Sequence, residues 1–175
     1  MNDNFGEIFC SFFQKRIPLL FSLLLVIMFC MPLDFFEMSG LRPQISIICT
    51  YYWIQKRPQA FGLVSAFVLG LIVDMCSTTP LGINCLLLML FSFTLNKIFY
   101  YIKPASFLID WLLFSLSLGL VLLIKWLVLI CYFQKYINAN TALLNGFSTI
   151  MFYPLIAWLS DLVRKNLLPQ ERINE

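Results

Sequence analysis

The fold of this chain is decided by residues 41–86, which read LRPQISIICTYYWIQKRPQAFGLVSAFVLGLIVDMCSTTPLGINCL. They hold two apolar segments, residues 43–54 and 59–75, with a basic turn between them. A helix needs about 20 residues to cross the hydrocarbon core of a bilayer. The second segment is therefore barely long enough and the first is too short, unless residues 35–41 extend it and draw Glu37 into the membrane. We expect a membrane protein that contains one short, shielded helix.

The composition of the whole chain agrees with a membrane protein. Of the 175 residues, 61% are hydrophobic and 12% are charged, and the mean hydropathy is +0.85. Soluble domains are about 45–50% apolar and about 25% charged. These values exclude an ordinary soluble globular protein, a disordered chain and a nucleic-acid-binding module.

The residue types also bear on chemistry. The chain has no histidine, so the commonest general base and the commonest metal ligand are both missing. Neither a phosphate-binding loop nor a hydrolase or zinc-protease motif is present, and no acidic cluster suits Mg²⁺. We therefore expect no enzyme, no cofactor and no metal site.

Six apolar segments predict an all-α integral membrane protein, a six-helix bundle with a short second helix. They occupy residues 17–33, 43–54, 59–75, 81–102, 106–132 and 141–163. The chain then forms one membrane domain, 1–175, with an N-terminal segment 1–16, six transmembrane helices within 17–163, and a tail 164–175. Pro154 lies inside the sixth segment and predicts a kink there.

The placement of the basic residues predicts the topology. Six spans put both termini on one side, and that side carries nine basic residues: Lys15, Arg16, Lys56, Arg57, Lys97, Lys103, Arg164, Lys165 and Arg172. The other side carries Arg42 and Lys135, and Lys125 lies within the fifth segment. Because Lys and Arg accumulate in cytoplasmic loops, we expect both the N and the C terminus to lie in the cytoplasm.

Aromatic side chains are expected to mark the membrane interfaces. Tyr51, Tyr52 and Trp53 end the second segment on the predicted cytoplasmic side, and Tyr100 and Tyr101 end the fourth segment there. Both groups fit the belts of Trp and Tyr that form at headgroup level.

The third segment carries a row of small residues that ends in a carboxylate. Gly62, Ala66, Gly70 and Asp74 recur every four residues and therefore share a helix face. Small residues let membrane helices approach closely, so this face packs against another helix of the chain or against a partner. A charge at this depth faces the protein interior. We expect Asp74 to pair with Arg42 or Lys125; a proton relay, a solute site or separate contacts with water are the alternatives.

Other polar side chains predict further helix contacts. Asn84, Ser92 and Asn96 share a face of the fourth segment and are expected to bond across helices, or else to line a solute path. Asp161 precedes two basic residues at three and four positions, which predicts a surface ion pair. Asp110 is expected to contact basic groups at the cytoplasmic face.

Residues 41–86 resemble the MreD family of rod shape-determining proteins. The order and spacing of the matching residues carry the resemblance, and outside this region the length, the six spans and the basic tail agree. The matching residues are Arg42, Pro43, Tyr52, Trp53, Pro58, Gly62, Gly70, Asp74, Pro80 and Gly82, with Pro154 in the last segment.

The resemblance implies a non-enzymatic scaffold of the bacterial cell-elongation complex, which serves peptidoglycan synthesis and rod shape. It implies MreC as the direct partner, with MreB, RodA and the elongation transpeptidase reached through the complex. It also implies a fold similar to the substrate-binding subunit of energy-coupling-factor transporters. A small-solute-binding transporter subunit is the alternative function, although the outer loops at 76–80 and 133–140 are short for a lid over a pocket.

Overall fold

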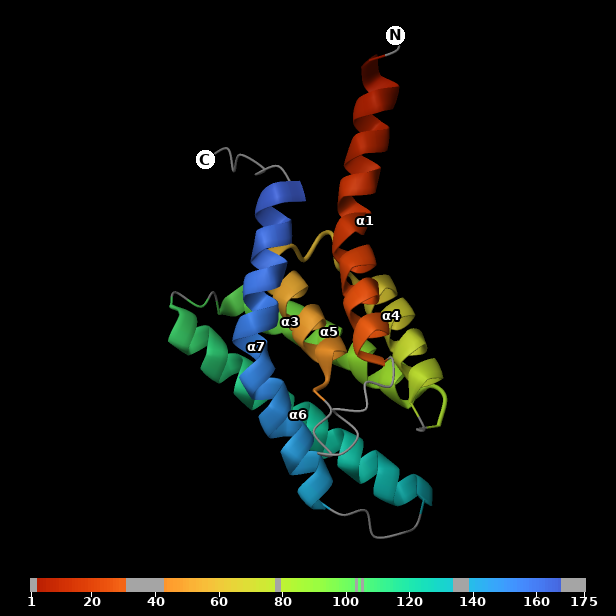
Figure 1. Ribbon diagram of the computed structural model, residues 1–175, viewed down its shortest axis with the longest axis vertical. Helices are drawn as coiled ribbons and strands as arrows, with labels where there is room; N and C mark the ends of the chain where they lie inside the picture. The colour runs from red at the N-terminus through yellow and green to blue at the C-terminus, as the bar shows by residue number, and fades with distance from the viewer. Residues whose placement is uncertain are drawn as a thin grey trace.

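The computed structural model describes residues 3–30, 43–77, 80–102, 104, 106–133 and 139–167. Over these ranges the chain is all-α, with six helices and no strand. They are α1 (Asp3–Cys30), α3 (Ile45–Lys56), α4 (Leu63–Cys76), α5 (Ile83–Tyr101), α6 (Phe107–Phe133) and α7 (Ala139–Leu167) (Figure 1). The helical fold and the short helix after the first apolar segment are as the sequence predicts.

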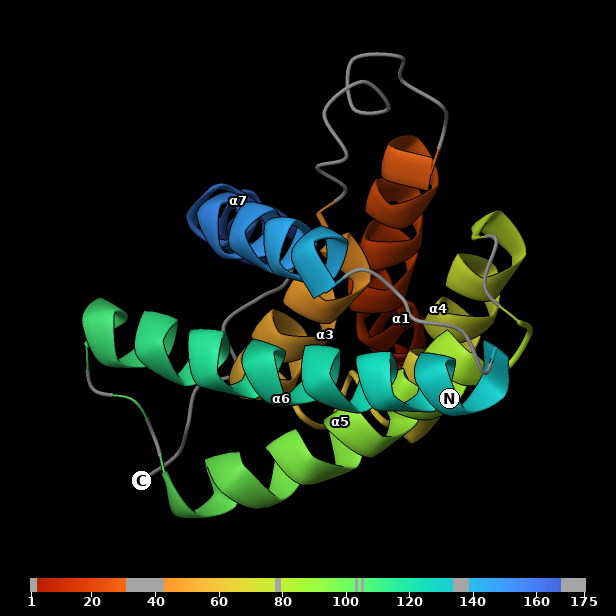
Figure 2. The same ribbon diagram turned by 90° about the horizontal axis from the view of Figure 1, so that it is seen from below.

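The short helix α3 lies at the centre of the bundle. It has 12 residues, and every side chain from Ile45 to Ile54 is buried. It contacts α1, α4, α5 and α7, as Figures 1 and 2 show from two sides. Backbone polar groups must be satisfied inside a membrane, and a short helix meets this condition only when the rest of the protein shields it. At its start, the backbone N–H of Gln44 donates to Oγ1 of Thr149 in α7 at 3.0 Å.

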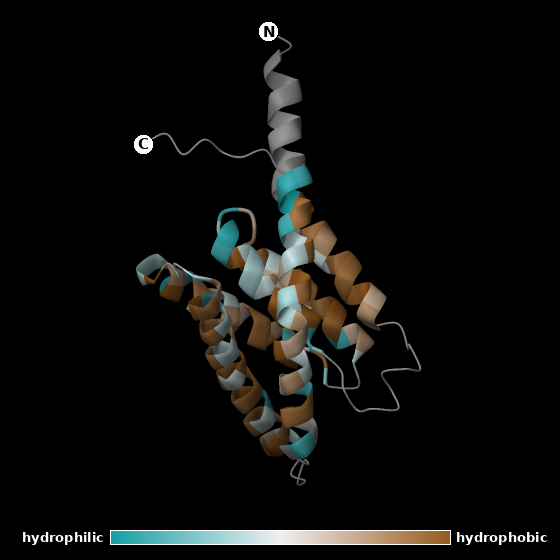
Figure 3. Cartoon of the chain, turned by 60° about the vertical axis from the view of Figure 1, so that its left-hand side comes forward, coloured by the Kyte–Doolittle hydropathy of each residue, from teal (hydrophilic) through white to brown (hydrophobic). Residues whose placement is uncertain are grey.

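Three of the described helices are long and apolar enough to cross a membrane. These spans are Ile83–Tyr101 of α5, Phe107–Tyr132 of α6 and Leu143–Asn166 of α7. The apolar parts of α1 and α4, Arg16–Cys30 and Leu63–Cys76, are shorter. Hydrophobic residues form most of the ribbon, and hydrophilic residues gather toward its ends (Figure 3). The chain is therefore a multi-pass membrane protein.

The two terminal helices extend beyond the other helices at one end of the molecule (Figure 1). The start of α1 and the end of α7 lie at the same end of the molecule (Figure 1). Residues 3–16, expected as a separate cytoplasmic segment, continue into the first apolar segment as one helix. Pro154 lies within α7, which is helical from Ala139 to Leu167.

The aromatic residues of α3 form the core of the bundle. Tyr51, Tyr52 and Trp53 are all buried, so the expectation that they belong to an interfacial belt is wrong. The reason is that α3 is enclosed on its sides, so its aromatic rings pack against neighbouring helices. Tyr100 and Tyr101 at the end of α5 are exposed, as an interfacial position requires.

Candidate functional site

One highly connected polar site is the junction between α4 and α5, where Asp74 is 2% exposed. Its Oδ2 accepts hydrogen bonds from the backbone N–H of Gly82 at 2.9 Å and of Cys85 at 3.1 Å. Its Oδ1 accepts from the backbone N–H of Asn84 at 3.1 Å and from Asn84 Nδ2 at 2.9 Å. The first N–H groups of a helix lack partners within the helix, and the positive end of its dipole favours an anion. Asp74 therefore caps α5 from the neighbouring helix.

Gly82 explains why the cap must come from another helix. It is the residue before α5 and has a φ of 102°, a left-handed conformation that glycine adopts without strain. Having no side chain, it cannot supply the usual capping oxygen. The carboxylate of Asp74 takes that role across eight residues of chain.

Gly70 brings the two helices close enough for this cap. A Cβ atom built on Gly70 would lie 2.5 Å from the Cα of Cys85, a separation that real Cβ atoms essentially never show. Ala66, one turn earlier, is fully buried. The row of small residues on α4 thus packs inside the molecule at Ala66 and Gly70, whereas a Cβ on Gly62 would have no atom within 4 Å. At Ala66 and Gly70 this face is not free for a partner.

The predicted ion pair of Asp74 stays a prediction. Arg42 lies outside the described residues. Lys125 of α6 interacts electrostatically with Asp74, but the direct contacts given above all come from the start of α5. Lys125 continues the inward row of α6 that includes Phe114, Leu118 and Val121, all buried. Three backbone N–H groups and the Asn84 amide donate to this carboxylate.

A second buried carboxylate ties three helices together. Asp110 of α6 accepts hydrogen bonds from the hydroxyl of Tyr51 at 2.9 Å, from Nε2 of Gln55 at 2.6 Å and from the hydroxyl of Tyr153 at 2.7 Å. These donors come from α3 and α7, and the rings of Phe114 and Tyr153 stack at 4.2 Å beside them. These described donors are neutral, and the expected contact of Asp110 with basic groups at the cytoplasmic face stays a prediction.

A third carboxylate holds the end of α3 against α7. Asp161 forms ion pairs with Arg164 and Lys165, which confirms the predicted surface pair. It also accepts a hydrogen bond from the hydroxyl of Tyr52 at 3.0 Å. The sequence did not predict this last contact. The signal that could have found it is a Tyr within an apolar segment, because a buried phenol needs an acceptor.

The fourth apolar segment gives a mixed result. Asn84 bonds across helices to Asp74 and to Ser77. Asn96, in contrast, donates to the carbonyl oxygen of Ser92 within α5. Among the described contacts, Asn84 therefore forms the expected bond to another helix, and Asn96 bonds within its own helix.

Three prolines of the sequence motif lie between the helices. Pro43 lies just before α3, Pro58 in the turn after it, and Pro80 before α5. Gly70, Asp74 and Gly82 meet at the α4–α5 junction, so this part of the motif describes a helix clamp. In the part of the chain that the structure describes, no group of three or more Cys, Asp or Glu side chains could hold a metal ion.

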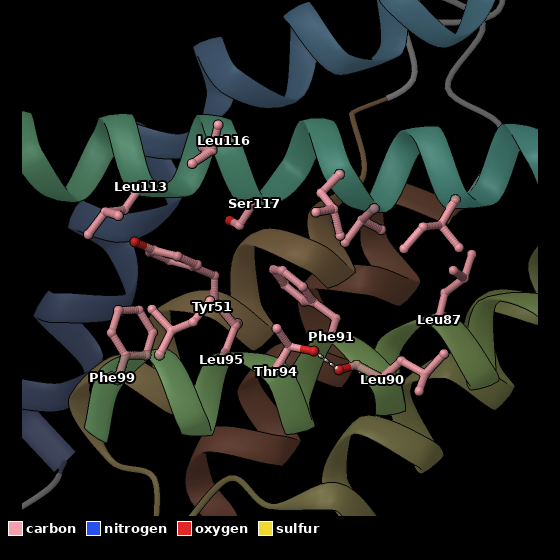
Figure 4. A pocket seen from close by; sticks show the side chains of 14 residues that line it. Tyr51, Leu87, Leu90, Phe91, Thr94, Leu95, Phe99, Leu113, Leu116 and Ser117 are labelled. Carbon is pink, nitrogen blue, oxygen red and sulfur yellow. Dashed lines mark hydrogen bonds between the residues drawn. The ribbon is translucent and has the colours of Figure 1, made fainter. Parts of the chain in front are cut away.

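A cavity of about 160 Å³ lies between α5 and α6 and reaches Tyr51 of α3 (Figure 4). Leucine, isoleucine, valine and phenylalanine side chains supply most of its lining. A site for a polar small molecule usually has a few convergent polar groups, and this lining is mostly apolar. The cavity therefore suits an apolar ligand.

The comparisons with known proteins give one match. The model of the family described as rod shape-determining protein MreD matches residues 11–163 of this chain. No curated protein and no solved structure matches it significantly. The matched range reaches into all six described helices.

Proposed function

Since this chain belongs to the MreD family of rod shape-determining proteins, we propose that it is a non-enzymatic inner-membrane scaffold of the cell-elongation complex and binds MreC directly. MreB, RodA and the elongation transpeptidase are its partners through that complex. The observation that carries the proposal is the family match over residues 11–163. It extends across the helical bundle and is not confined to one short motif.

The contacts of three carboxylates support a scaffold, because each of them joins helices of the bundle. Asp74 joins α4 to α5, Asp110 joins α6 to α3 and α7, and Asp161 joins α7 to α3. Each carboxylate is occupied by donors of the bundle itself. Such bonds fix the relative positions of helices, and a protein that positions partners needs a fixed surface.

We propose further that the ends of α3 and α7 face the cytoplasm. Lys56 and Arg57 lie at the end of α3, and Arg164 and Lys165 lie in the last turn of α7. The start of α1 lies at the same end of the molecule as the end of α7 (Figure 1). The positive-inside rule favours this orientation.

Affinity purification tests the proposed partner. The full chain, tagged at its C terminus, is purified from cells in a mild detergent and its companions are identified by mass spectrometry. Recovery of MreC, and its absence with an unrelated tagged multi-pass protein, is the expected result. Recovery of an ATPase module in place of MreC would instead indicate a transporter subunit.

Depletion of the protein separates the same two functions in living cells. A scaffold of elongation predicts rounded cells whose shape no added nutrient restores. A solute-binding subunit predicts a growth defect that one nutrient rescues. Normal rods after depletion would contradict the proposed function.

A further inference from the structure

The cavity between α5 and α6 has properties of a ligand site that the proposed function does not use. Its three polar side chains are all engaged elsewhere. Thr94 Oγ1 donates to the carbonyl oxygen of Leu90 at 2.8 Å (Figure 4). Ser117 Oγ donates to the carbonyl oxygen of Phe114 at 2.8 Å, and the hydroxyl of Tyr51 donates to Asp110. No hydroxyl of the lining therefore requires a polar partner in the cavity. Apolar cavities of about 150 Å³ stay dry and accept apolar molecules.

The cavity opens toward the lipid side of two membrane spans. Leu90 of α5 and Leu116 and Leu120 of α6 line it and are also exposed. Both helices are long and apolar enough to cross the bilayer, so hydrocarbon chains meet this opening. A second helix, about 10 Å wide with its side chains, is too wide for so small a cavity. An acyl chain is narrow and flexible enough to enter it.

An exposed cation lies on α5 beside the residues that line the cavity. Lys97 follows the lining residues Leu90 and Thr94 by seven and three positions, which places it on the same side of α5. Its side chain is exposed, and its Nζ lies 4.7 Å from the centre of the Phe93 ring. Tyr101, one turn further and strongly exposed, is of the kind found at headgroup level.

From these features we propose that the cavity binds one acyl chain of an anionic phospholipid whose phosphate pairs with Lys97. The apolar lining selects the chain, the exposed leucines admit it from the bilayer, and Lys97 selects the charge of the headgroup. The site does not depend on the proposed scaffold function.

Native mass spectrometry of the purified full chain tests the site. The protein is freed of lipid in detergent and titrated with phosphatidylglycerol or phosphatidylcholine. The wild-type chain is expected to retain one phosphatidylglycerol more tightly than phosphatidylcholine, by roughly fivefold for one lysine near an anionic headgroup. Lys97→Gln should abolish this preference and Lys97→Arg should restore it.

A matched pair of leucines tests the cavity itself. Leu120 lines it and is 59% exposed, whereas Leu123 is outside it and is 58% exposed. Because both side chains lie on the surface of α6, a tryptophan is tolerated at either position. Leu120→Trp should remove the retained lipid and Leu123→Trp should keep it.

Three results would overturn the proposal. Equal lipid retention by the two tryptophan variants would show that the lipid binds elsewhere. A phosphatidylglycerol preference that persists in Lys97→Gln would show that Lys97 does not select the headgroup. Loss of a co-purified membrane protein in Leu120→Trp, with lipid retention unchanged, would identify a protein partner as the occupant.

Discussion

Asp74 of α4 accepts a hydrogen bond from the backbone N–H of Gly82 at 2.9 Å and thereby caps the helix that follows it in the chain. The same carboxylate also binds the N–H groups of Asn84 and Cys85. One side chain therefore joins the end of α4 to the start of α5 through three backbone N–H groups. Its position inside the bundle makes this junction the best place to test the structure.

Replacing Asp74 by Asn should lower the stability of the bundle. Both carboxylate oxygens of Asp74 accept hydrogen bonds from N–H groups. In Asn an NH₂ group replaces one of these oxygens, and it cannot accept a hydrogen bond from the N–H that it faces. Loss of a capping side chain costs about 0.5–2 kcal/mol, and a buried group left without its partner about 1–3 kcal/mol. The measurement is the midpoint of thermal unfolding in detergent, followed by size-exclusion chromatography.

Asp161→Asn is a suitable control for Asp74→Asn, because its ion pairs with Arg164 and Lys165 are partly exposed and contribute less. Equal folded yield and equal midpoint for Asp74→Asn and the wild-type chain would contradict the cap. We do not expect Asp74→Glu to recover wild-type stability. Its side chain is one methylene longer, so its carboxylate cannot meet the same donors unless α4 or α5 moves.

Replacing Gly70 by Ala should separate α4 from α5. The new methyl group would lie 2.5 Å from a backbone atom of Cys85, which cannot turn aside as a side chain could. Overpacking of this kind costs about 1–3 kcal/mol. The control is Gly119→Ala in α6, where a Cβ meets no atom within 4 Å. The thermal midpoint should fall for Gly70→Ala and remain within error for Gly119→Ala; equal midpoints would show that the helices are further apart.

Replacing Tyr153 by Phe should destabilise the junction of α3, α6 and α7. The change removes the 2.7 Å hydrogen bond to Oδ2 of Asp110 and leaves the stacking on Phe114 in place. A buried acceptor that loses its donor costs about 1–3 kcal/mol. Tyr100→Phe is the control, because that hydroxyl is exposed at the end of α5. If the two variants unfold at the same temperature, Asp110 does not depend on Tyr153.

The helical architecture could be predicted because a membrane limits the choices. Long apolar segments become helices, since no other open structure satisfies its backbone groups in hydrocarbon. The short α3 followed from its bounds, because Pro43 and the basic residues Lys56 and Arg57 leave too little chain for a span. The structure ends this helix at Lys56, within two residues of the expected end.

The partners of the carboxylates could not be predicted from local spacing. Backbone N–H groups have no residue signature, so nothing in the sequence showed that Asp74 would meet the start of α5. Asp110 binds Tyr51 and Tyr153 at separations of 59 and 43 residues. Such pairs depend on how the helices cross, which the spacing of residues along one sequence does not show. The charge of Asp110 suggested basic partners, whereas the hydroxyls of Tyr51 and Tyr153 donate to it in the structure.

The proposed orientation can be tested with two cysteine positions at opposite ends of the bundle. Cys76 is exposed at the end of α4, and Lys165 is exposed in the last turn of α7. In a chain that otherwise lacks cysteine, Cys76 alone should react with a membrane-impermeant maleimide added to intact spheroplasts. Lys165→Cys alone should react only after the membrane is permeabilised, because a cytoplasmic α7 end places it inside. If both positions react in intact spheroplasts, the chain does not cross the membrane between them. If only Lys165→Cys reacts there, the basic end of α7 lies outside the cell.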